Sequence, residues 1–525
     1  MTRLKTGVAV LAALLALPLQ AGAATLRWAN DGDASAMDPY TRNETFQGSL
    51  LANIYEGLLR RNRKLELEPS LATAWAQTSP TVWRFTLRQG VKWQDGTPFT
   101  AEDVVFSFHR AAAQSSMQRS VVAGIAEVRS PDPGTVELVT ENPNPILPQV
   151  ISNFVIMSKA WCEAHDAAEP VVLAGNKENY AVRQAMGTGP FRLVSREPDR
   201  RTVLERNPTW WDTPEHNLDR VEFTVIGNAS TRVAALISGD MDMIYTVPPQ
   251  DADRIARTPG LHLVQGPELR TIFLGMDQGR DELLKSSVKG RNPFKDLRVR
   301  QAFMLAIDEP AIAARIMRGQ ARPTALLWGP GVNGYDPALD QRPVPDVARA
   351  KALMAEAGYA DGFTLGLDCP NDRYVNDEAI CTAVVPMLAR IGVKVELSSR
   401  TKARHFAEIN PPGNNTSFFM LGWSPSSYDA HNVLFDLLGT QDGSRGADND
   451  GRYSNPGLDK LVDRIGVETD QASRQTLISE AARLVQADIA AIPLHQQVLV
   501  WAAKDKVDLV QRADNYFALR YVRMK

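Results

Sequence analysis

A short polar loop in the second half of the chain carries side chains that could bind an anion. Asn371, Arg373 and Tyr374 lie close together there, directly after a strand-like apolar run. The planar guanidinium of Arg373 can present two parallel N–H donors, so a bidentate pair with the carboxylate of a ligand is one role for this residue. A salt bridge to the neighbouring Asp372 or Asp377 is the other role, and the sequence favours neither.

Two of the three cysteines bracket this loop. Cys369 precedes it and Cys381 follows it. A disulfide between them would stiffen the base of the loop and stabilise the fold by about 3 kcal/mol on the chain-entropy model. The pairing stays open at this point, because it depends on the distance between two Cα atoms, which spacing along the chain does not set. Cys162 would be left over, and we expect it to be buried and inert.

Patterns for catalysis are missing from the sequence. It contains no Gly-x-Ser-x-Gly, no His-Glu-x-x-His and no Gly-x-x-x-x-Gly-Lys-Ser/Thr motif. One Gly-x-Gly-x-x-Gly run, at Gly329, Gly331 and Gly334, contains Pro330 and leads into Pro337 where a dinucleotide site needs a helix start, so we predict a loop. The seven histidines are scattered. We therefore predict no catalytic residue, no metal site and no cofactor.

The first 23 residues have the pattern of a secretory signal peptide. Arg3 and Lys5 form a positive start, residues 8–19 are apolar but short for a bilayer span, and residues 21–23 are the small residues of a cleavage site. A membrane anchor is the weaker alternative. Cleavage removes two basic residues and no acidic ones, which leaves 56 Lys+Arg against 61 Asp+Glu, a net charge of −5. This balance argues against a nucleic-acid-binding protein.

The mature chain is too long for one typical domain. Its roughly 500 residues predict at least two lobes, and the 44% hydrophobic content suffices for two cores. Strand-like runs alternate with helical ones, which is typical of an α/β fold. The hydrophobic pattern and the turn residues predict strands over 26–29, 82–87, 136–139, 240–245 and 391–397, and helices over 230–239, 298–307, 347–357 and most of 458–489.

The longest recognisable pattern lies near residue 100. Trp93 is followed by an Asp95–Gly96 turn, and Thr100 and Asp103 have the spacing of a helix start. Further motifs are GTGPFRLV (187–194), NPTWW (207–211), VRQAFMLAID (299–308), AKALMAEAGYADGF (350–363) and YSNPGLDKLV (453–462). In this order the motifs resemble the family 5 extracytoplasmic solute-binding proteins, the peptide- and nickel-binding receptors of ABC importers.

The resemblance covers nearly the whole mature chain. It implies an α/β fold of the type II periplasmic binding protein kind, with two lobes and a hinge. The first lobe is expected to be discontinuous and to carry an extra subdomain. Hinge crossings are expected near 270–280 and 485–495. The implied division is a signal peptide at 1–23, lobe I at 24–275 with a subdomain at about 61–180, lobe II at 276–490, and a C-terminal return to lobe I at 491–525.

The resemblance also marks the segment around Trp423 as ligand-binding. Trp423 stands where peptide receptors of the family have an aromatic platform, and packing in the core is the alternative. Ser426 stands where those receptors have an aspartate that pairs with the α-amino group of the peptide. A hydroxyl cannot neutralise an ammonium, so this departure argues against a ligand with a free α-amino group. Asp429 matches a different family position, although a shift of the loop could bring it to that role. Ser424 and Tyr428 complete the candidates from this segment.

A third candidate set follows the first predicted strand. The resemblance places this segment at the rim of the cleft, whereas acids and amides in such a loop are more often turn formers. Its members are Asp38, Tyr40, Arg42, Asn43, Glu44 and Phe46.

Together these features predict the substrate-binding receptor of an ABC importer in the periplasm of a Gram-negative-type cell. It is expected to act as a monomer, to capture a small peptide or peptide-like solute by hinge closure, and to deliver it to an inner-membrane permease with a cytoplasmic ATPase. The same role for a non-peptide ligand (a glutathione-like conjugate, an opine, a metal chelate, haem or an oligosaccharide) is the alternative. An exported hydrolase, or a chaperone-like or signalling protein on the same fold, are the competing classes.

Overall fold

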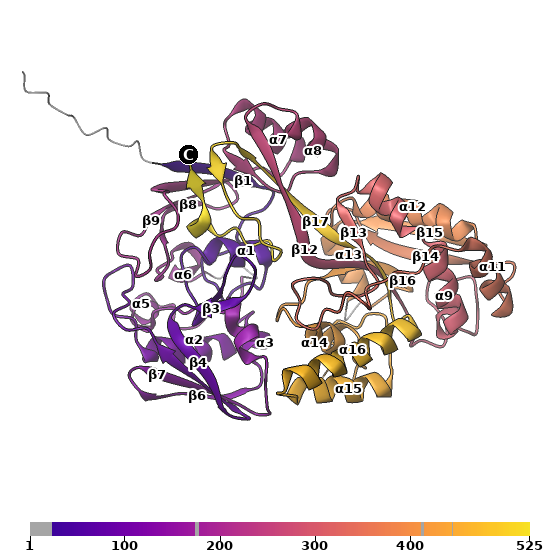
Figure 1. Cartoon of the computed structure of the whole chain (residues 1–525), viewed down its shortest axis with the longest axis horizontal. Helices are drawn as coiled ribbons and strands as arrows, with labels where there is room; N and C mark the ends of the chain where they lie inside the picture. The colour runs from indigo at the N-terminus through magenta and orange to yellow at the C-terminus, as the bar shows by residue number, and fades with distance from the viewer. Residues whose placement is uncertain (1–23, 174–177, 411–413, 444) are drawn as a thin grey trace, which may run out of the picture.

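A computed structural model describes residues 24–173, 178–410, 414–443 and 445–525 of the chain. The predicted signal peptide at 1–23 lies outside the described residues. The molecule has two bodies, which Figure 1 shows side by side with two long strands between them. We call the body formed by residues 24–260 and 505–525 lobe I, and the body formed by residues 277–491 lobe II.

One mixed β-sheet runs through both lobes. Its strand order is β15-β14-β16-β12-β17-β11-β1-β10-β9-β8, with β13 paired to β17. The strands of lobe I are β1 (Thr25–Asn30), β8 (Phe191–Glu197), β9 (Arg201–Arg206), β10 (Arg220–Val225) and β11 (Met243–Ile244). Those of lobe II are β13 (Ala321–Pro323), β14 (Phe363–Pro370), β15 (Val393–Arg400) and β16 (Phe418–Trp423). β1 is parallel to β10 and β11, and β14 is parallel to β15 and β16, so each lobe contains parallel strands.

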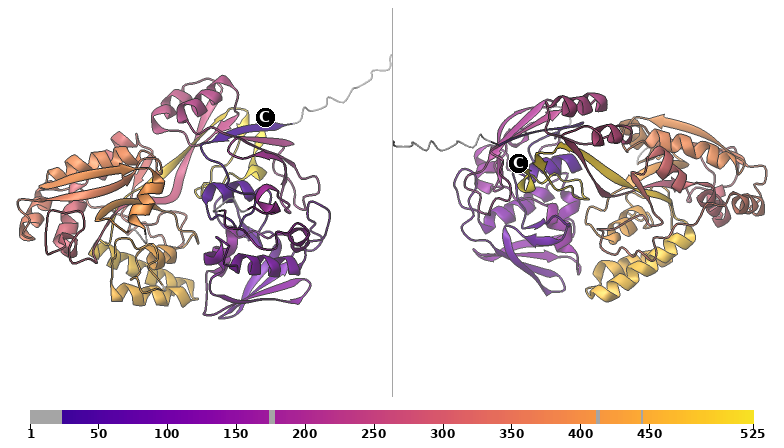
Figure 2. Two further views of the ribbon diagram at one scale, coloured as in Figure 1. Left: turned by 180° about the vertical axis from the view of Figure 1, so that it is seen from behind. Right: turned by 45° about the horizontal axis from the view of Figure 1, so that its top comes forward.

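Two long antiparallel strands, β12 (Leu261–Met276) and β17 (Ile492–Lys504), connect the lobes. The C-terminal end of β17 pairs with β11 in lobe I, whereas the C-terminal end of β12 pairs with β16 in lobe II. Figure 2 shows the same connection from behind and in a view tilted by 45° so that its top comes forward. The predicted boundaries at residues 275 and 490 lie next to the ends of these strands in lobe II.

Lobe I carries a separate four-stranded antiparallel sheet, in the order β4-β5-β7-β6, that packs against α2. Its strands are β4 (Ala72–Ser79), β5 (Val82–Leu87), β6 (Ile125–Asp132) and β7 (Thr135–Thr140). Two small pairs join β2 (Leu59–Arg61) to β3 (Leu67–Pro69) and β18 (Val507–Asp508) to β19 (Arg523–Met524). The helices of lobe I are α1 (Thr45–Leu51), α2 (Ala101–Ala112), α3 (Arg119–Val122), α4 (Leu147–Val150), α5 (Lys159–Ala164), α6 (Tyr180–Arg183), α7 (Ala229–Ser238) and α8 (Pro249–Ala256).

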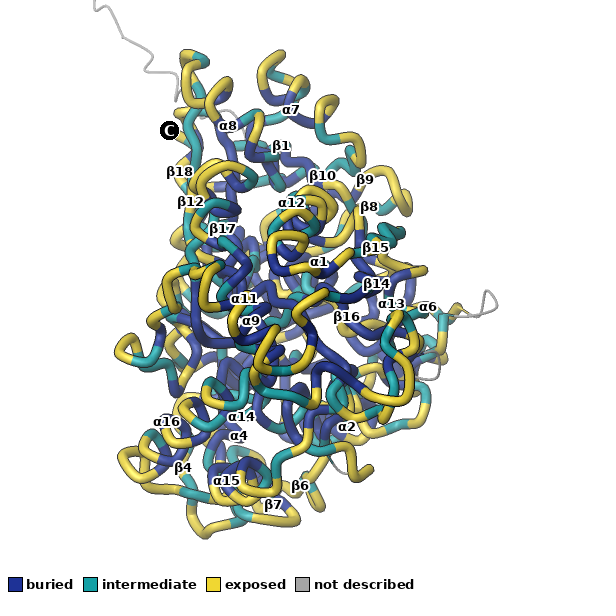
Figure 3. The backbone as a smooth tube through the Cα atoms, turned by 90° about the vertical axis from the view of Figure 1, so that its right-hand side faces the viewer, coloured by how far each residue is buried: buried dark blue, intermediate teal, exposed yellow. Residues whose placement is uncertain are grey.

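Lobe II packs its helices around β14, β15 and β16. Figure 3 shows the central strands buried and the outer helical turns exposed. Its helices are α9 (Leu297–Ala306), α10 (Glu309–Ala311), α11 (Val347–Glu356), α12 (Asp377–Ala389), α13 (Lys402–Ile409), α14 (Ala430–Asn432), α15 (Pro456–Val467) and α16 (Gln471–Asp488).

Aromatic packing explains how the C-terminal segment returns to lobe I. Trp28 on β1 is buried, and its ring centroid lies 4.5 Å from that of Phe223 on β10 and 5.0 Å from that of Phe517. Aromatic pairs at such distances stabilise beyond the area they bury. One hydrophobic cluster therefore joins β1 to the C-terminal segment of the chain.

The start of α2 confirms the local pattern seen in the sequence. The Asp103 carboxylate accepts the backbone N–H of Thr100 at 2.8 Å, which is half of a capping box. Gly96 has a φ of +90°, as the predicted turn requires. Trp93 is buried in the core of lobe I.

Most predicted elements match the structure to within two or three residues, and one does not. Of the predicted strand at 240–245, only the two residues of β11 pair with neighbouring strands, namely β1 and β17. Gly239, with a φ of +92°, ends α7 just before this segment. Gly331 and Gly334 lie in a loop with no helix after them, as predicted. None of the described helices is long and apolar enough to cross a membrane.

Candidate functional site

A cavity of about 1010 Å³ lies between the two lobes. Lobe I contributes residues within 39–51, 118–124, 140–155 and 513–516. Lobe II contributes Arg373, Tyr374, Gly466 and residues within 406–410, 421–436 and 447–450, although Asp429 is not among them. The connecting strand β12 adds three further residues. Because both lobes supply walls, the volume of the cavity depends on how the lobes are placed relative to each other.

One wall carries two arginines around an aromatic ring. The guanidinium carbons of Arg270 and Arg373 lie 5.8 and 5.4 Å from the ring centroid of Tyr374. Arg270 lies 3.4 Å from the carboxylate of Glu268, whereas Arg373 is exposed and makes no ion pair with any described residue. The loss of water inside the cleft, and then the nearby charge of Arg270, lower the pKa of Arg373. This wall is suited to an anionic group, because guanidinium donors match carboxylate geometry.

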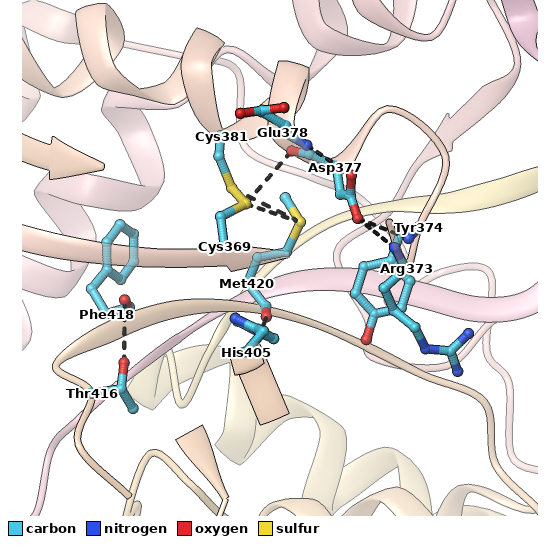
Figure 4. The surroundings of a disulfide bond; sticks show 10 residues. All are labelled: Cys369, Arg373, Tyr374, Asp377, Glu378, Cys381, His405, Thr416, Phe418 and Met420. Carbon is cyan, nitrogen blue, oxygen red and sulfur yellow. Dashed lines mark hydrogen bonds between the residues drawn. A yellow bond between two sulfur atoms is a disulfide. The ribbon is translucent and has the colours of Figure 1, made fainter. Parts of the chain in front are cut away.

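The structure shows neither of the salt bridges that the sequence offered as one role for Arg373. The Asp377 carboxylate accepts the backbone N–H groups of Arg373 and Tyr374, at 2.9 and 3.0 Å. The Asp372 carboxylate accepts the backbone N–H of Lys402. Neither acid pairs with the guanidinium, which points away from the disulfide beside it (Figure 4).

The loop that carries Arg373 is braced at its base. Cys369 at the end of β14 and Cys381 in α12 form a disulfide, with their Cα atoms 6.6 Å apart. The backbone N–H of Val375 donates to Gln497 on β17 at 3.1 Å, and the Gln497 amide donates to Glu268 on β12 at 2.8 Å. These contacts tie the arginine loop to both strands that connect the lobes.

Arg270 reaches the cavity because β12 departs from regular pairing. Its register with β17 shifts between Pro267 and Thr271, and the three residues within the shift, Glu268, Leu269 and Arg270, all line the cavity. Proline cannot donate to the ladder, and bulges commonly re-aim side chains beside binding sites. The sequence analysis did not identify these residues as part of the site. The sequence did contain a signal for them, because a Glu and an Arg flank one leucine directly before an apolar strand.

Trp423 packs against the core and also faces the cavity, so its predicted role in ligand contact stays a prediction. It is half-buried against the core of lobe II, and it lines the cavity. Its Nε1 donates to Asn432 Oδ1 at 2.9 Å, which orients the indole. A Cβ at the preceding Gly422 would lie 2.8 Å from Tyr374 and 3.1 Å from Arg270, so glycine lets both side chains pack directly on β16.

Tyr428 connects the lobes across the cavity. It belongs to lobe II, and its hydroxyl contacts two residues of lobe I, accepting from Asn153 at 2.8 Å and donating to Asp514 at 2.9 Å. The guanidinium carbon of Arg61, also in lobe I, lies 3.7 Å from its ring centroid. Burial raises the pKa of Tyr428 well above its usual value, so the hydroxyl stays protonated.

Two acids from the candidate sets lie outside the cavity wall. Asp429 is fully buried and pairs with both terminal nitrogens of Arg474, at 2.7 and 2.8 Å. Asp38 is fully buried and pairs in the same way with Arg110. Each carboxylate is neutralised inside its own lobe, so we leave both residues out of the proposed ligand contacts.

The other predicted site residues divide by position. Asn371 is exposed but does not line the cavity. Phe46 does not line it either. The remaining candidates that line it are Tyr40, Arg42, Asn43, Glu44, Ser424 and Ser426.

Three aspartates on the lobe II side of the cavity were also missed. Asp436, Asp448 and Asp450 all line it, and none forms an ion pair with a described residue. Burial, and then the charge of Asp448, raise the pKa of Asp436 to about 6 and that of Asp450 to about 7. In the sequence they resemble ordinary loop acids, because no periodic pattern marks them.

A family model for the bacterial extracellular solute-binding proteins, family 5, matches residues 66–445 of the chain. The chain belongs to this family. Its members are binding proteins, not enzymes, and they deliver ligands to ABC permeases. The prediction of a non-enzymatic solute-binding protein is therefore confirmed.

Relatives of this solute-binding protein match most of its length. A glutathione-binding protein from Pectobacterium atrosepticum is 26% identical over 483 residues, which cover 90% of this chain and 88% of the relative. A solved structure of the Helicobacter pylori protein DppA with the peptide STSA has a TM-score of 0.78 at 22% identity, covering 95% of this chain and 98% of that one. The Listeria monocytogenes protein CtaP has a TM-score of 0.81 at 19% identity, covering 96% and 99%. These structures confirm the predicted fold.

Proposed function

We propose that this chain is the periplasmic receptor of an ABC importer for a peptide-like solute with a free carboxylate. The observation that carries the proposal is the unpaired guanidinium of Arg373 beside Arg270 in the wall of a two-lobed cavity. A ligand carboxylate there would gain charge-assisted hydrogen bonds, each worth about 1.5–3 kcal/mol. The aromatic faces of Trp423 and Tyr374 would cover apolar parts of the ligand.

Glutathione is the first compound to test. It is a γ-linked tripeptide with two carboxylates and one ammonium, so it matches a wall with two arginines. Several relatives at 24–26% identity are glutathione-binding proteins, which supports the same choice. Other neighbours hold different solutes, among them agropinic acid and the dipeptide Met-Leu, so these belong in the same panel.

Capture would proceed by hinge closure on β12 and β17. A ligand held by the wall of Arg373 in lobe II would favour the closed state by also contacting lobe I, for instance at the exposed Arg42 and Asn43. Tyr428 already joins the lobes by hydrogen bonds. The closed form would then dock on an inner-membrane permease, and the leader-like residues 1–23 support export to the periplasm.

Calorimetry and thermal unfolding with the purified mature chain test the proposal. The panel is glutathione, Met-Leu, agropinic acid and, as an uncharged control, maltotriose. We expect an acidic member to raise the melting temperature and to bind 10- to 100-fold more weakly to Arg373→Gln. Arg349→Gln is the matched control, because Arg349 is a half-exposed arginine of α11 that does not line the cavity. Binding of maltotriose alone, or unchanged affinity in Arg373→Gln, would refute the proposal.

A further inference from the structure

Three aspartates line the lobe II side of the cavity, and none of them forms an ion pair within the part of the chain that the structure describes. The backbone N–H of Asp448 donates to the carbonyl of Asp436, and that of Asp450 donates to the carbonyl of Asp448, both at 3.0 Å. The three residues are therefore neighbours in the fold, and the charge of Asp448 acts on both Asp436 and Asp450. Arg452 is the cation that acts on Asp450, and its own guanidinium is engaged with the Asn414 side chain.

Asp450 supplies a second and independent observation. Its side chain lines the cavity although the residue is only 3% exposed. Its Oδ1 is buried and accepts no hydrogen bond from any described residue. A buried carboxylate oxygen without a donor is costly to keep, so a donor group of a bound solute would stabilise this carboxylate at the cavity wall.

A hydrogen-bond chain connects these acids to the aromatic wall. Asn432 accepts from the Trp423 indole at 2.9 Å and donates to the Asp436 carboxylate at 2.5 Å. Trp423 on β16 pairs with Thr271 on β12, and Thr271 is the residue after Arg270. Trp423 therefore lies between the arginine wall on one side and the three aspartates on the other.

The geometry points to an ammonium-binding subsite formed by Asp436, Asp448 and Asp450, so that the solute is a zwitterion with its carboxylate at Arg270 and Arg373. This inference rests on the proposed function, since it names the class of solute that the same cavity takes. The solute would carry a cationic amine, and its apolar part would lie along Trp423. Three acceptors suit the three N–H donors of an ammonium.

A metal ion fits the three aspartates less well. No group of three or more histidine, cysteine, aspartate or glutamate side chains in the described parts of the chain has the spacing to hold a metal ion. An ammonium accepts longer and less regular contacts than a divalent cation, whose ligands must lie within about 2.0–2.6 Å.

Two pairs of compounds that differ only in the ammonium test the subsite. The first pair is glutathione and glutaryl-Cys-Gly, its des-amino analogue. The second pair is Met-Leu and 4-(methylthio)butanoyl-Leu. Each is titrated calorimetrically at pH 8 into the wild type, Asp448→Asn, Asp450→Asn and, as a matched control, Asp281→Asn, which removes a fully exposed acid of lobe II outside the cavity.

We expect the ammonium-bearing member of at least one pair to bind the wild type at least 10-fold more tightly than its des-amino analogue. Asp448→Asn and Asp450→Asn should lose most of that difference and leave the analogue's affinity within about 2-fold, whereas Asp281→Asn should match the wild type. The melting temperature of each variant establishes that it is folded.

The outcomes separate this inference from the proposed function. If the analogues bind as tightly as their parent compounds, the ammonium subsite is wrong and the receptor function stands. The same holds if both aspartate variants keep the full preference for the ammonium. If no acidic compound of the panel binds the folded wild type, the proposed function fails and the subsite falls with it.

Discussion

Replacing Asp450 by asparagine should stabilise the unliganded protein at neutral pH and have little effect near pH 4. Asp450 is 3% exposed, and burial followed by the charge of Asp448 raises its pKa from 3.8 to about 7. Between these two values the unfolded chain has an ionised Asp450 while the folded chain keeps it protonated. The stability that this proton provides is therefore present at low pH and is lost as the pH rises through 7.

The magnitude follows from the two pKa values. Each pKa unit corresponds to about 1.4 kcal/mol, so the full difference is about 4 kcal/mol in the free energy of unfolding at pH 8. Asparagine has nearly the same shape and does not ionise, so Asp450→Asn is free of this loss. For a lobe of this size the gain corresponds to an increase in melting temperature on the order of 10 °C.

Differential scanning calorimetry of both proteins without ligand, at pH 4, 5, 6, 7 and 8, checks this prediction. The difference in melting temperature should grow between pH 4 and 7 and then level off. Asp281→Asn, which alters a fully exposed acid, should show no such growth. An Asp450→Asn protein that is less stable than the wild type at pH 8, or a difference independent of pH, would show that Asp450 is not a strained carboxylate.

Three further predictions concern the other parts of the site. Arg373→Lys should weaken binding of glutathione about 10-fold in calorimetry, because an ammonium cannot replace a bidentate guanidinium; equal affinity would show that the residue does not contact a carboxylate. Tyr428→Phe removes two hydrogen bonds between the lobes, each worth about 1 kcal/mol. Small-angle scattering of the unliganded variant should therefore show a larger radius of gyration than that of the wild type. An unchanged scattering curve would contradict this. Cys381→Ser should lower the free energy of unfolding by about 3 kcal/mol, because it removes the disulfide with Cys369. The wild type in reductant should have the same free energy of unfolding as this variant. A wild type whose stability does not change in reductant would argue against the disulfide.

The sequence alone determined the class of the protein and most of its elements. The start of α2 was readable because Asp95–Gly96 and the Thr100–Asp103 spacing act within a few residues of one another. The ends of α7 and α11 were readable for the same reason, since Gly239 and Gly358 both have positive φ. Such signals depend on local backbone chemistry, which does not need the rest of the fold.

The tertiary structure decided which polar residues face the solute. Asp429 and Arg373 are both charged loop residues after an apolar strand, yet the first is neutralised by Arg474, 45 positions away, and the second is left exposed in the cavity. Arg270 and Asp450 enter the wall through a register shift and a loop contact. Whether a charge is paired depends on which distant element lies against it, and that arrangement exists only once the two lobes have packed.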